Sequence, residues 1–426
     1  MFKRGIIMES HIYLCIDLKS FYASVECVSR GLDPFQTNLV VADASRGKGA
    51  ICLAITPAMK ALGIRNRCRL FEIPPDVDYI AAKPRMRLYM QTSAEIYAVY
   101  LRHVSPQDIY VYSIDECFID AAPYLQLYRT TPVALAKRLM QAVFDATGIC
   151  ATAGIGTNLF LAKVALDITA KHSPDHIGVL DEDSFRKTVW FHRPITDIWN
   201  IGRGTARRLE KFGVRDLHGV AMLPEDCLFR EFGVNARFLI DHANGREPCT
   251  IAEIQAYQAK SLSFSNSQIL FSDYTAQDAF TVLREMIDAQ TLRLVEAGMV
   301  AGSLSLSVGY SKDVLPPSGG SRTLEVHTDS YRKIMAVFTE LYERTTHMEK
   351  PVRKLSVAFA DLKPKAAATF SLFDDLAAQQ KEASLQQARI LIKNKYGKNA
   401  LLRGVSYTEA GTARLRNTLI GGHNGE

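Results

Sequence analysis

Residues 109–120, IYVYSIDECFID, constrain the fold more than any other part of the 426-residue chain. Their apolar residues are typical of a buried β-strand, yet Asp115 and Glu116 stand side by side in the middle. Burying an unpaired carboxylate costs free energy and raises its pKa. Since neighbouring residues of a regular strand point to opposite faces, the two acids share one site only where the strand breaks or turns. They mark either such a site or an exposed hairpin tip.

A divalent cation would remove the cost of burying these acids. A third acid, Asp17, ends another strand-like run, HIYLCID at 11–17. Mg²⁺ prefers carboxylate oxygens and shares its coordination sphere with substrate phosphates. Three carboxylates on neighbouring strands can hold two cations, an arrangement that suits in-line phosphoryl transfer.

Strand and helix patterns alternate across 11–171, which predicts an α/β or α+β domain with acids at strand ends. A helix–turn–helix pattern follows at 195–213, and a second α+β domain is expected at 261–362. The tail, 363–426, is polar and basic, and we expect it to be partly disordered. The expected strands include 11–17, 38–43 and 149–157, and the expected helices are 85–103, 132–146, 158–171 with Asn158 as N-cap, 276–297 and 329–346.

Composition narrows the class of protein. No apolar run approaches the roughly 18–20 residues that cross a membrane, and the first ten residues lack the apolar core of a secretory signal. The eight cysteines form no C-x-x-C pair, which indicates reduced thiols in a cytoplasmic protein without structural zinc. A net charge of +6 permits an anionic partner.

Two motifs carry a resemblance to a known family. YLCIDLKSFYASVECV followed by VYSIDECFID resembles the two palm motifs of the Y-family DNA polymerases, the translesion enzymes. The resemblance continues through AGIGTNLFLAKVALDITAKHSP, IWNIGRGTARRLEKFGV and KSLSFSNSQIL. The terminal GKNALLRGVSYTEAGTARLRNTLIGGH is similar to the bacterial ultraviolet-repair and polymerase IV-like branch. The resemblance covers nearly the whole chain, and the matching motifs occur in the same order as in the family.

The resemblance implies an α+β multidomain fold, a right-hand polymerase. Its parts are a ferredoxin-like palm, small fingers, a helical thumb with a helix–hairpin–helix and an α+β little finger. The implied boundaries are 1–20 and 87–176 for the palm, 21–86 for the fingers, 177–249 for the thumb, 250–260 for a linker, 261–362 for the little finger and 363–426 for the tail.

The implied activity is low-fidelity, template-directed addition of deoxynucleotides to a primer across damaged DNA. The implied partners are primer–template DNA, deoxynucleoside triphosphates and the bacterial sliding clamp, for a monomer that needs no membrane. One alternative is a non-catalytic DNA-binding or clamp-associated repair accessory protein. The presence of Asp17, Asp115 and Glu116 disfavours it, because a protein without catalysis has no need of buried acids. Another is a nucleotide cyclase, which would need neither the helix–hairpin–helix nor the domain after it.

By this resemblance Asp17, Asp115 and Glu116 are the catalytic residues. With the Leu18 carbonyl they hold two Mg²⁺ ions. Lys163 is either a phosphate contact or a structural lysine whose stem lies along apolar surface, and the sequence favours the structural role.

The resemblance also places the nucleotide. Phe21 and Tyr22 pack against the incoming sugar, with Tyr22 as the steric gate that excludes a ribose 2′-hydroxyl. Lys60 and Lys171 contact the triphosphate. Many relatives carry tyrosine and arginine where this chain has Pro57 and Lys60, and lysine lacks the bidentate fork of arginine, which weakens the expected grip.

DNA is expected along the thumb and little finger. Main-chain N–H groups near two glycines at a helix start suit a phosphate, and nearby cations add sequence-independent attraction. TFSLFDD, 369–375, resembles a clamp-binding peptide, although Thr369 replaces its usual glutamine. The DNA candidates are Gly202, Arg203, Gly204, Arg207, Arg208, Lys211, Ser261, Ser263 and Ser265, and the clamp candidates are Phe370, Leu372 and Phe373.

Overall fold

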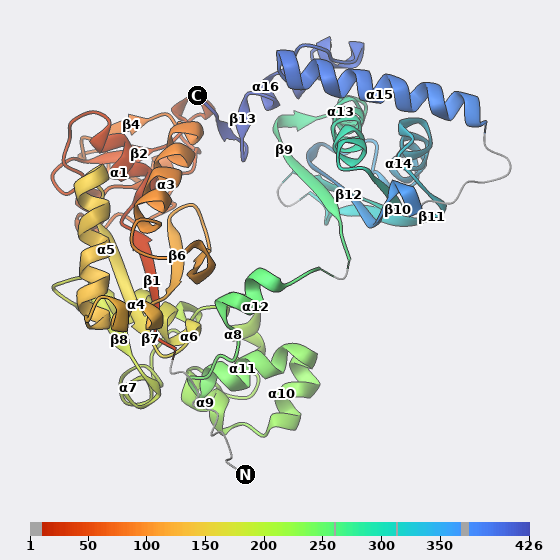
Figure 1. The fold of residues 1–426 in the computed structure, drawn as a ribbon. Coiled ribbons are helices and arrows are strands. Elements are labelled where there is room, and N and C mark those ends of the chain that lie inside the picture. The colour runs from red at the N-terminus through yellow and green to blue at the C-terminus, as the bar shows by residue number, and fades with distance from the viewer. Residues whose placement is uncertain (1–10, 260, 312–313, 368–374) are drawn as a thin grey trace. The chain divides into compact units, whose positions relative to one another are not determined.

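The computed structural model describes residues 11–259, 261–311, 314–367 and 375–426. The chain forms two compact units (Figure 1). The first spans Met1–Tyr257 and includes Glu426, and the second spans Gln258–Gly425.

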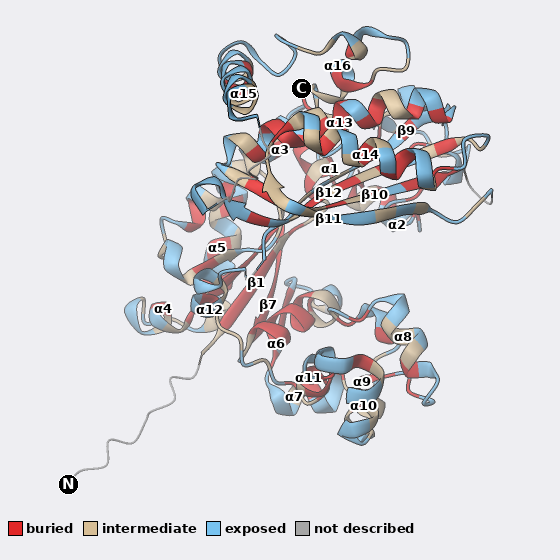
Figure 2. Cartoon of the chain, turned by 90° about the vertical axis from the view of Figure 1, so that its right-hand side faces the viewer, coloured by how far each residue is buried: buried red, intermediate tan, exposed pale blue. Residues whose placement is uncertain are grey.

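A five-stranded sheet in the order β5-β6-β1-β7-β8 is the centre of the first unit. Its middle strand, β1, pairs antiparallel with β6 and β7, and Figure 2 shows β1 and β7 buried. The strands are β1 (Tyr13–Leu18), β5 (Ile109–Val111), β6 (Glu116–Asp120), β7 (Ala151–Gly156) and β8 (Ile177–Leu180).

Helix α6 (Leu159–Val164) lies directly against this sheet. A Cβ added at Gly154 would lie 2.1 Å from the Ala162 carbonyl oxygen, and one at Gly156 would lie 2.2 Å from the Ala162 nitrogen. Only glycine permits so close an approach. Tyr13, Cys15 and Asp17 of β1 share this face, because their register partners are Gly156, Gly154 and Thr152.

The predicted helix at 158–171 begins as expected, with Asn158 accepting from the Leu161 N–H. It does not continue as an α-helix, because a wider turn, Ala165–Thr169, and a short 3₁₀ turn, Ala170–His172, follow α6. The other helices of the sheet domain are α3 (Met86–Tyr100), α4 (Ala122–Leu127) and α5 (Pro132–Thr147), so the expected helices at 85–103 and 132–146 are confirmed.

A small three-stranded sheet, in the order β3-β2-β4, forms a separate layer within the first unit. It buries its own apolar cluster, which includes Val40, Ile55 and Met59. Its elements and the helices beside it are α1 (Phe21–Val28), β2 (Leu39–Val41), β3 (Ala54–Ile55), α2 (Pro57–Ala61) and β4 (Ile80–Ala82).

Short helices follow the five-stranded sheet. The apolar sides of the first five share one cluster that also contains Phe160 of α6, and Ile251 of the last joins a cluster with Tyr13 and Phe118 of the sheet, so all six pack onto the sheet domain. They are α7 (Glu182–Thr188), α8 (Arg203–Glu210), α9 (Leu217–Met222), α10 (Glu225–Phe232), α11 (Ala236–Ala243) and α12 (Ile251–Ala256).

The second unit is an antiparallel sheet, β11-β10-β12-β9, with two long helices packed against it. Burial alternates along β12, so one face of the sheet meets the helices and the other stays polar. The elements are β9 (Phe264–Tyr274), α13 (Ala276–Glu296), β10 (Met299–Tyr310), β11 (Ser318–Thr328), α14 (Tyr331–Thr345) and β12 (Val352–Pro364).

The expectation of a partly disordered tail is wrong for residues 375–426. They form α15 (Leu376–Tyr396), α16 (Ala413–Arg416), β13 (Leu419–Ile420) and β14 (His423–Asn424). Two acids of α13 hold them, the buried Glu285 and the partly buried Asp288. Glu285 accepts hydrogen bonds from the main-chain N–H groups of Thr412 and Ala413, each 2.9 Å long. Asp288 binds Arg389 of α15 at 2.6 Å and Arg403 at 2.6 Å.

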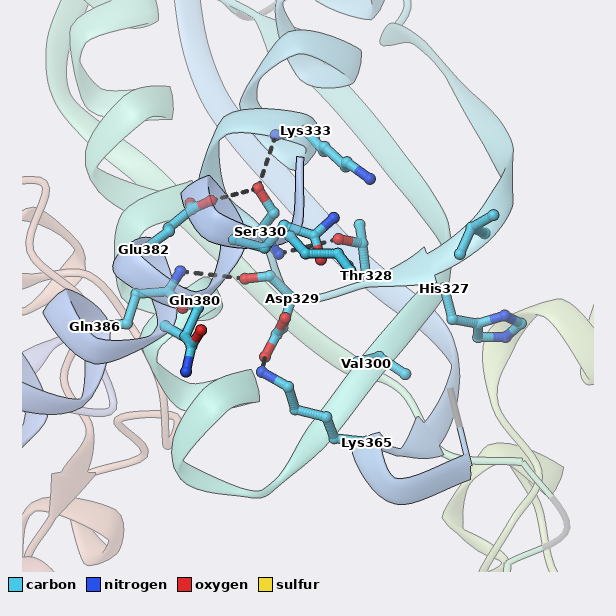
Figure 3. A pocket seen from close by; sticks show the side chains of 14 residues that line it. Val300, His327, Thr328, Asp329, Ser330, Lys333, Lys365, Gln380, Glu382 and Gln386 are labelled. Carbon is cyan, nitrogen blue, oxygen red and sulfur yellow. Dashed lines mark hydrogen bonds and ion pairs between the residues drawn. The ribbon is translucent and has the colours of Figure 1, made fainter. Parts of the chain in front are cut away.

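A cavity of about 280 Å³ lies where α15 meets the start of α14 (Figure 3). Its polar side chains bind one another. Ser330 donates to Glu382 at 2.7 Å, Lys365 pairs with Asp329 at 2.6 Å, and Gln386 donates to the Asp329 carbonyl at 3.2 Å (Figure 3). Since these groups already bind one another, the cavity belongs to the interface through which α15 packs against the start of α14.

Replacing Asp288 by asparagine should destabilise the second unit by about 3–5 kcal/mol, because Arg389 would stay buried without its partner. Burial raises the pKa of Asp288, but the two arginines outweigh burial and lower it. The folded pKa therefore lies below the unfolded value of about 3.9. The stabilisation is present above that pH and is lost as the pH falls through the folded pKa.

Thermal unfolding from neutral to acidic pH measures this effect, and hydrogen exchange of residues 376–396 localises it. Asp273→Asn is the matched control, because Asp273 pairs with Arg353 at the surface at 3.5 Å. Equal loss of stability in the two variants would contradict the role given to Asp288.

Candidate active site

The acidic stretch at 109–120 is a hairpin and not the single strand that its apolar residues predict. The chain turns between β5 and β6, and the N–H groups of Tyr112 and Ser113 both donate to the Glu116 carbonyl at 3.0 Å. The Ser113 hydroxyl donates to Asp115 at 2.7 Å. This is the break in the ladder that lets both acids serve one site.

Asp17 lies at the same end of the sheet. It stands opposite Glu116 in the β1–β6 register, and the Leu18 N–H donates to the Asp115 carbonyl at 2.9 Å. Directly opposite residues of an antiparallel pair point to the same face. The structure therefore brings together the three acids that the sequence singled out.

Glu116 is buried and has two further partners. Its Oε1 is 2.9 Å from Lys163 Nζ and accepts from the Cys15 thiol at 3.0 Å. Lys163 also pairs with Asp167 at 2.9 Å. Burial lowers the pKa of Lys163, but Asp167 and Glu116 outweigh burial and raise it. Lys163 is thus a charged neighbour of the acids. The sequence alone left open whether it contacts a phosphate or has a structural role.

The closeness of the three acids affects the pKa of Asp17. Burial, then Asp115 and Glu116, raise the pKa of Asp17 to about 7, while Lys163 opposes the rise. Among the described residues no three His, Cys, Asp or Glu side chains stand in a ready-made ligand arrangement. The donor set still fits Mg²⁺, because it offers hard oxygens whose mutual repulsion a cation would relieve.

Magnesium affinity should therefore depend on pH. A ligand carboxyl has to be deprotonated, and Asp17 keeps its proton below about pH 7. Binding should weaken as the pH falls below that value and should release most of one proton at about pH 6.5 and almost none at about pH 8. Titration calorimetry in buffers of different ionisation enthalpy counts these protons. Equal affinity and no proton release at both pH values would contradict this site.

Tyr22 follows the β1 strand that carries Asp17, and its ring packs against another aromatic ring. Burial and Asp115 raise its pKa, so its hydroxyl lies within electrostatic range of that acid. The ring stacks on Tyr89 with centroids 4.5 Å apart and planes at 19°. The Tyr89 hydroxyl donates to Glu26 at 2.6 Å, and Arg85 binds the same carboxylate at 2.7 Å. Phe21, next in the chain to Tyr22, is buried.

Glu26, Arg85 and Tyr89 are functional candidates that the sequence did not reveal. Burial raises the pKa of Glu26, yet hydrogen bonds from Arg85, Tyr89 and Arg30 hold it below its usual range. An acid inside the apolar run ASVECV was the one available signal, because its partners lie about sixty positions away.

Lys60 and Lys171 gather near the acids. Burial and Lys171 lower the pKa of Lys60, while Asp17 opposes them, so the three groups lie within electrostatic range. A further cation, Lys19, joins them, since burial and Lys60 lower its pKa. In the described part of the chain none of these three ammonium groups forms an ion pair with an acid.

The four predicted cations of the helix–hairpin–helix separate into two pairs. Arg208 and Lys211 bind Glu231 of α10 at 2.8 and 3.3 Å, which ties them to helix packing. Arg203 and Arg207 are exposed. Gly202 is the N-cap of α8, and nothing lies within 4 Å of a Cβ added at Gly202 or Gly204. The start of α8 is therefore open to a phosphate.

In the second unit the sheet face turned away from α13 and α14 carries small and hydroxyl side chains. Ser265 stands opposite Ala358, and Ser267 donates to or accepts from Ser356 at 2.8 Å. Ser261 and Ser263 are exposed just before β9. The clamp candidates Phe370, Leu372 and Phe373 lie outside the described residues, so they stay a prediction.

No helix within the described residues is long and apolar enough to cross a membrane. Two family models match the chain, that of the impB/mucB/samB family at residues 16–167 and that of its C-terminal domain at 261–372.

Two relatives match over nearly the full chain. A Bacillus subtilis (strain 168) protein named "Putative UV-damage repair protein UvrX" is 35% identical over 96% of this chain and 97% of its own. "DNA polymerase IV 2" of the same organism is 28% identical over 98% of this chain and 100% of its own. A solved structure, "Y-family DNA polymerase chimera Dbh-Dpo4(243-245)-Dbh", shares the fold with a TM-score of 0.61 and 19% identity, over 82% of this chain and 98% of the other.

Proposed function

The chain belongs to the impB/mucB/samB family, among the Y-family proteins of bacterial ultraviolet repair and the polymerase IV type, and we propose that it is a DNA-directed DNA polymerase that extends primers across damaged bases. The resemblance seen in the sequence and the α+β polymerase fold are both confirmed. The observation that carries the proposed activity is the meeting of Asp17, Asp115 and Glu116 at one end of the sheet, with Asp115 within electrostatic range of Tyr22.

In the proposed mechanism the three acids and the Leu18 carbonyl hold two Mg²⁺ ions. When bound, these ions supply charge neutralisation for the triphosphate and a lowered pKa for the primer 3′-hydroxyl. Glu116 and Asp115, which now bind Lys163 and Ser113, would hold the ions through their carboxylate oxygens. Lys163 would keep Asp167 as its partner.

The other residues bind and orient the nucleotide. Lys60 and Lys171 attract the triphosphate, since neither ammonium group is neutralised by an acid among the described residues. Tyr22, backed by Tyr89, presents a rigid wall to the sugar. Catalysis then rests on positioning and charge stabilisation.

DNA would be bound without reading its sequence. We assign the palm, fingers, thumb, little finger and tail to the boundaries that the sequence predicted. The start of α8 would bind a phosphate and the exposed Arg203 and Arg207 would add attraction. The hydroxyl-bearing face of the second unit, including Ser265, would contact the backbone of the duplex. We further propose a cytoplasmic monomer that docks on the sliding clamp through 369–375.

Tolerance of lesions follows from the small three-stranded sheet. Its strands are two or three residues long and α2 has five residues, so little structure is available to enclose the new base pair. Weak enclosure lowers discrimination by shape.

Primer extension across one abasic site tests this proposal. We expect the wild-type chain to continue past the site with Mg²⁺ and deoxynucleotides. Extension that always stops one nucleotide before the site would contradict the lesion-bypass role and leave an ordinary polymerase. Damaged-template binding without any extension would favour the accessory-protein alternative.

A further inference from the structure

Trp199 connects two parts of the first unit that the sequence separates by more than eighty residues. Its indole N–H donates to the Tyr112 hydroxyl at 3.0 Å. The two rings meet edge to face, with centroids 6.0 Å apart and planes at 77°. Trp199 stands just before Asn200–Gly202, the loop that leads into α8.

Tyr112 is the first residue of the turn that carries Asp115. Its N–H donates to the Glu116 carbonyl at 3.0 Å, and this hydrogen bond joins the two sides of the hairpin on which both acids stand. Its ring meets Phe118 edge to face at 5.8 Å, and Trp199 also lies 6.1 Å from Phe118. The rings of Trp199, Tyr112 and Phe118 therefore brace the hairpin on both sides of the acids.

Trp199 is itself held firmly from behind. Its ring stacks on His242 with centroids 6.0 Å apart and planes at 17°, and His242 stacks on Phe160 of α6 at 4.2 Å. The buried His242 is fixed by Glu247 at 2.9 Å. Trp199 is thus the outer end of a stacked column that begins at the sheet domain.

The loop after Trp199 has little freedom. Ile201 donates to the Ile198 carbonyl at 3.1 Å, and Asn200 is left-handed with φ of 66°. Asparagine is one of the few residues with a side chain that adopts this conformation readily, so the turn has a defined backbone. A phosphate bound at Gly202 would consequently fix the position of Trp199, three residues away.

We propose that Trp199 is a positioning residue, which through Tyr112 holds the hairpin of Asp115 and Glu116 in place when DNA occupies the start of α8. This rests on the proposed polymerase function. It assigns to the Trp199–Tyr112 contact a role in the rate of the chemical step and none in DNA affinity, because neither ring belongs to the phosphate site.

The contact is poorly placed to serve folding alone. Tyr112 is 40% exposed, and an exposed hydrogen bond adds little net stability because water replaces either partner. Small shifts of catalytic groups, by contrast, cost large factors in rate.

Single-turnover extension from pre-bound primer–template at saturating deoxynucleotide tests the proposal. Trp199→Phe and Tyr112→Phe each remove one side of the hydrogen bond and keep a ring. We expect each variant to slow the step about tenfold, with DNA affinity and the melting temperature nearly unchanged. The double variant should be no slower than either single one, because both lose the same contact.

Trp190→Phe is the matched control. Trp190 is the other tryptophan of the chain and also donates an indole hydrogen bond, to the Ala243 carbonyl at 2.8 Å, without contacting the hairpin. We expect its rate to equal that of the wild type. Wild-type rates in Trp199→Phe and Tyr112→Phe, or an equal loss in Trp190→Phe, would overturn the positioning role alone. No extension by the wild type would overturn the proposed function as well.

Discussion

Changing Asp115 to asparagine and Glu116 to glutamine together should lower the rate of primer extension by at least about 10²–10³-fold. Amides keep the size of both side chains but cannot neutralise a cation. The two negative charges that would hold the metal ions are therefore lost. Binding of primer–template DNA should stay close to that of the wild type, because α8 and the second unit are unchanged. Single-nucleotide addition and fluorescence anisotropy measure the two quantities.

The fold is expected to survive this change, since Lys163 keeps Asp167 at 2.9 Å. Glu182→Gln with Asp183→Asn is the matched control, because these acids are also adjacent and both are exposed in the first turn of α7. Extension by the Asp115/Glu116 variant at more than a tenth of the control's rate would show that the acids are not the metal ligands.

Shortening Tyr22 to alanine should raise the relative use of ribonucleotides by about 10²-fold. The ring can exclude a 2′-hydroxyl only while it stays in place, and the stack on Tyr89, held by Glu26 and Arg85, keeps it there. Addition of a deoxynucleotide should fall far less, because the acids are untouched. The ratio of the two kcat/KM values measures the gate.

Tyr257→Ala is the control for this change, because Tyr257 is 72% exposed and ends the first unit. Its nucleotide preference should equal that of the wild type. If Tyr22→Ala excluded ribonucleotides as strongly as the control does, the gate would have to lie elsewhere in the site.

Much of the fold could be predicted from local signals. The helix expected at 132–146 is observed at 132–147, and that expected at 276–297 is observed at 276–296, each started by a threonine N-cap. A turn within 109–120 was expected only as one possibility, because YSID carries no glycine or proline and its apolar neighbours continue the strand pattern. The tail was missed because its order depends on Glu285 and Asp288, more than a hundred positions away.

In the candidate site, too, residues with a local sequence signal could be predicted, whereas those that depend on distant partners could not. Asp115 and Glu116 were candidates because two adjacent acids inside an apolar run carry a burial cost that a bound cation would relieve, and the resemblance to the palm motifs favoured a site over a hairpin tip. Lys163 was visible but ambiguous, because its partner Glu116 lies on another strand. Tyr89 and Trp199 gave no signal, since an aromatic residue in a helix or before a turn is ordinary in a core.

Single-nucleotide addition by the wild-type chain on four undamaged primer–templates, which differ only in the templating base, tests the central claim most directly. With Mg²⁺ present, the account predicts that each template selects its complementary deoxynucleotide. Failure of the folded protein to add any nucleotide, even with the sliding clamp present, or addition that ignores the templating base, would contradict it.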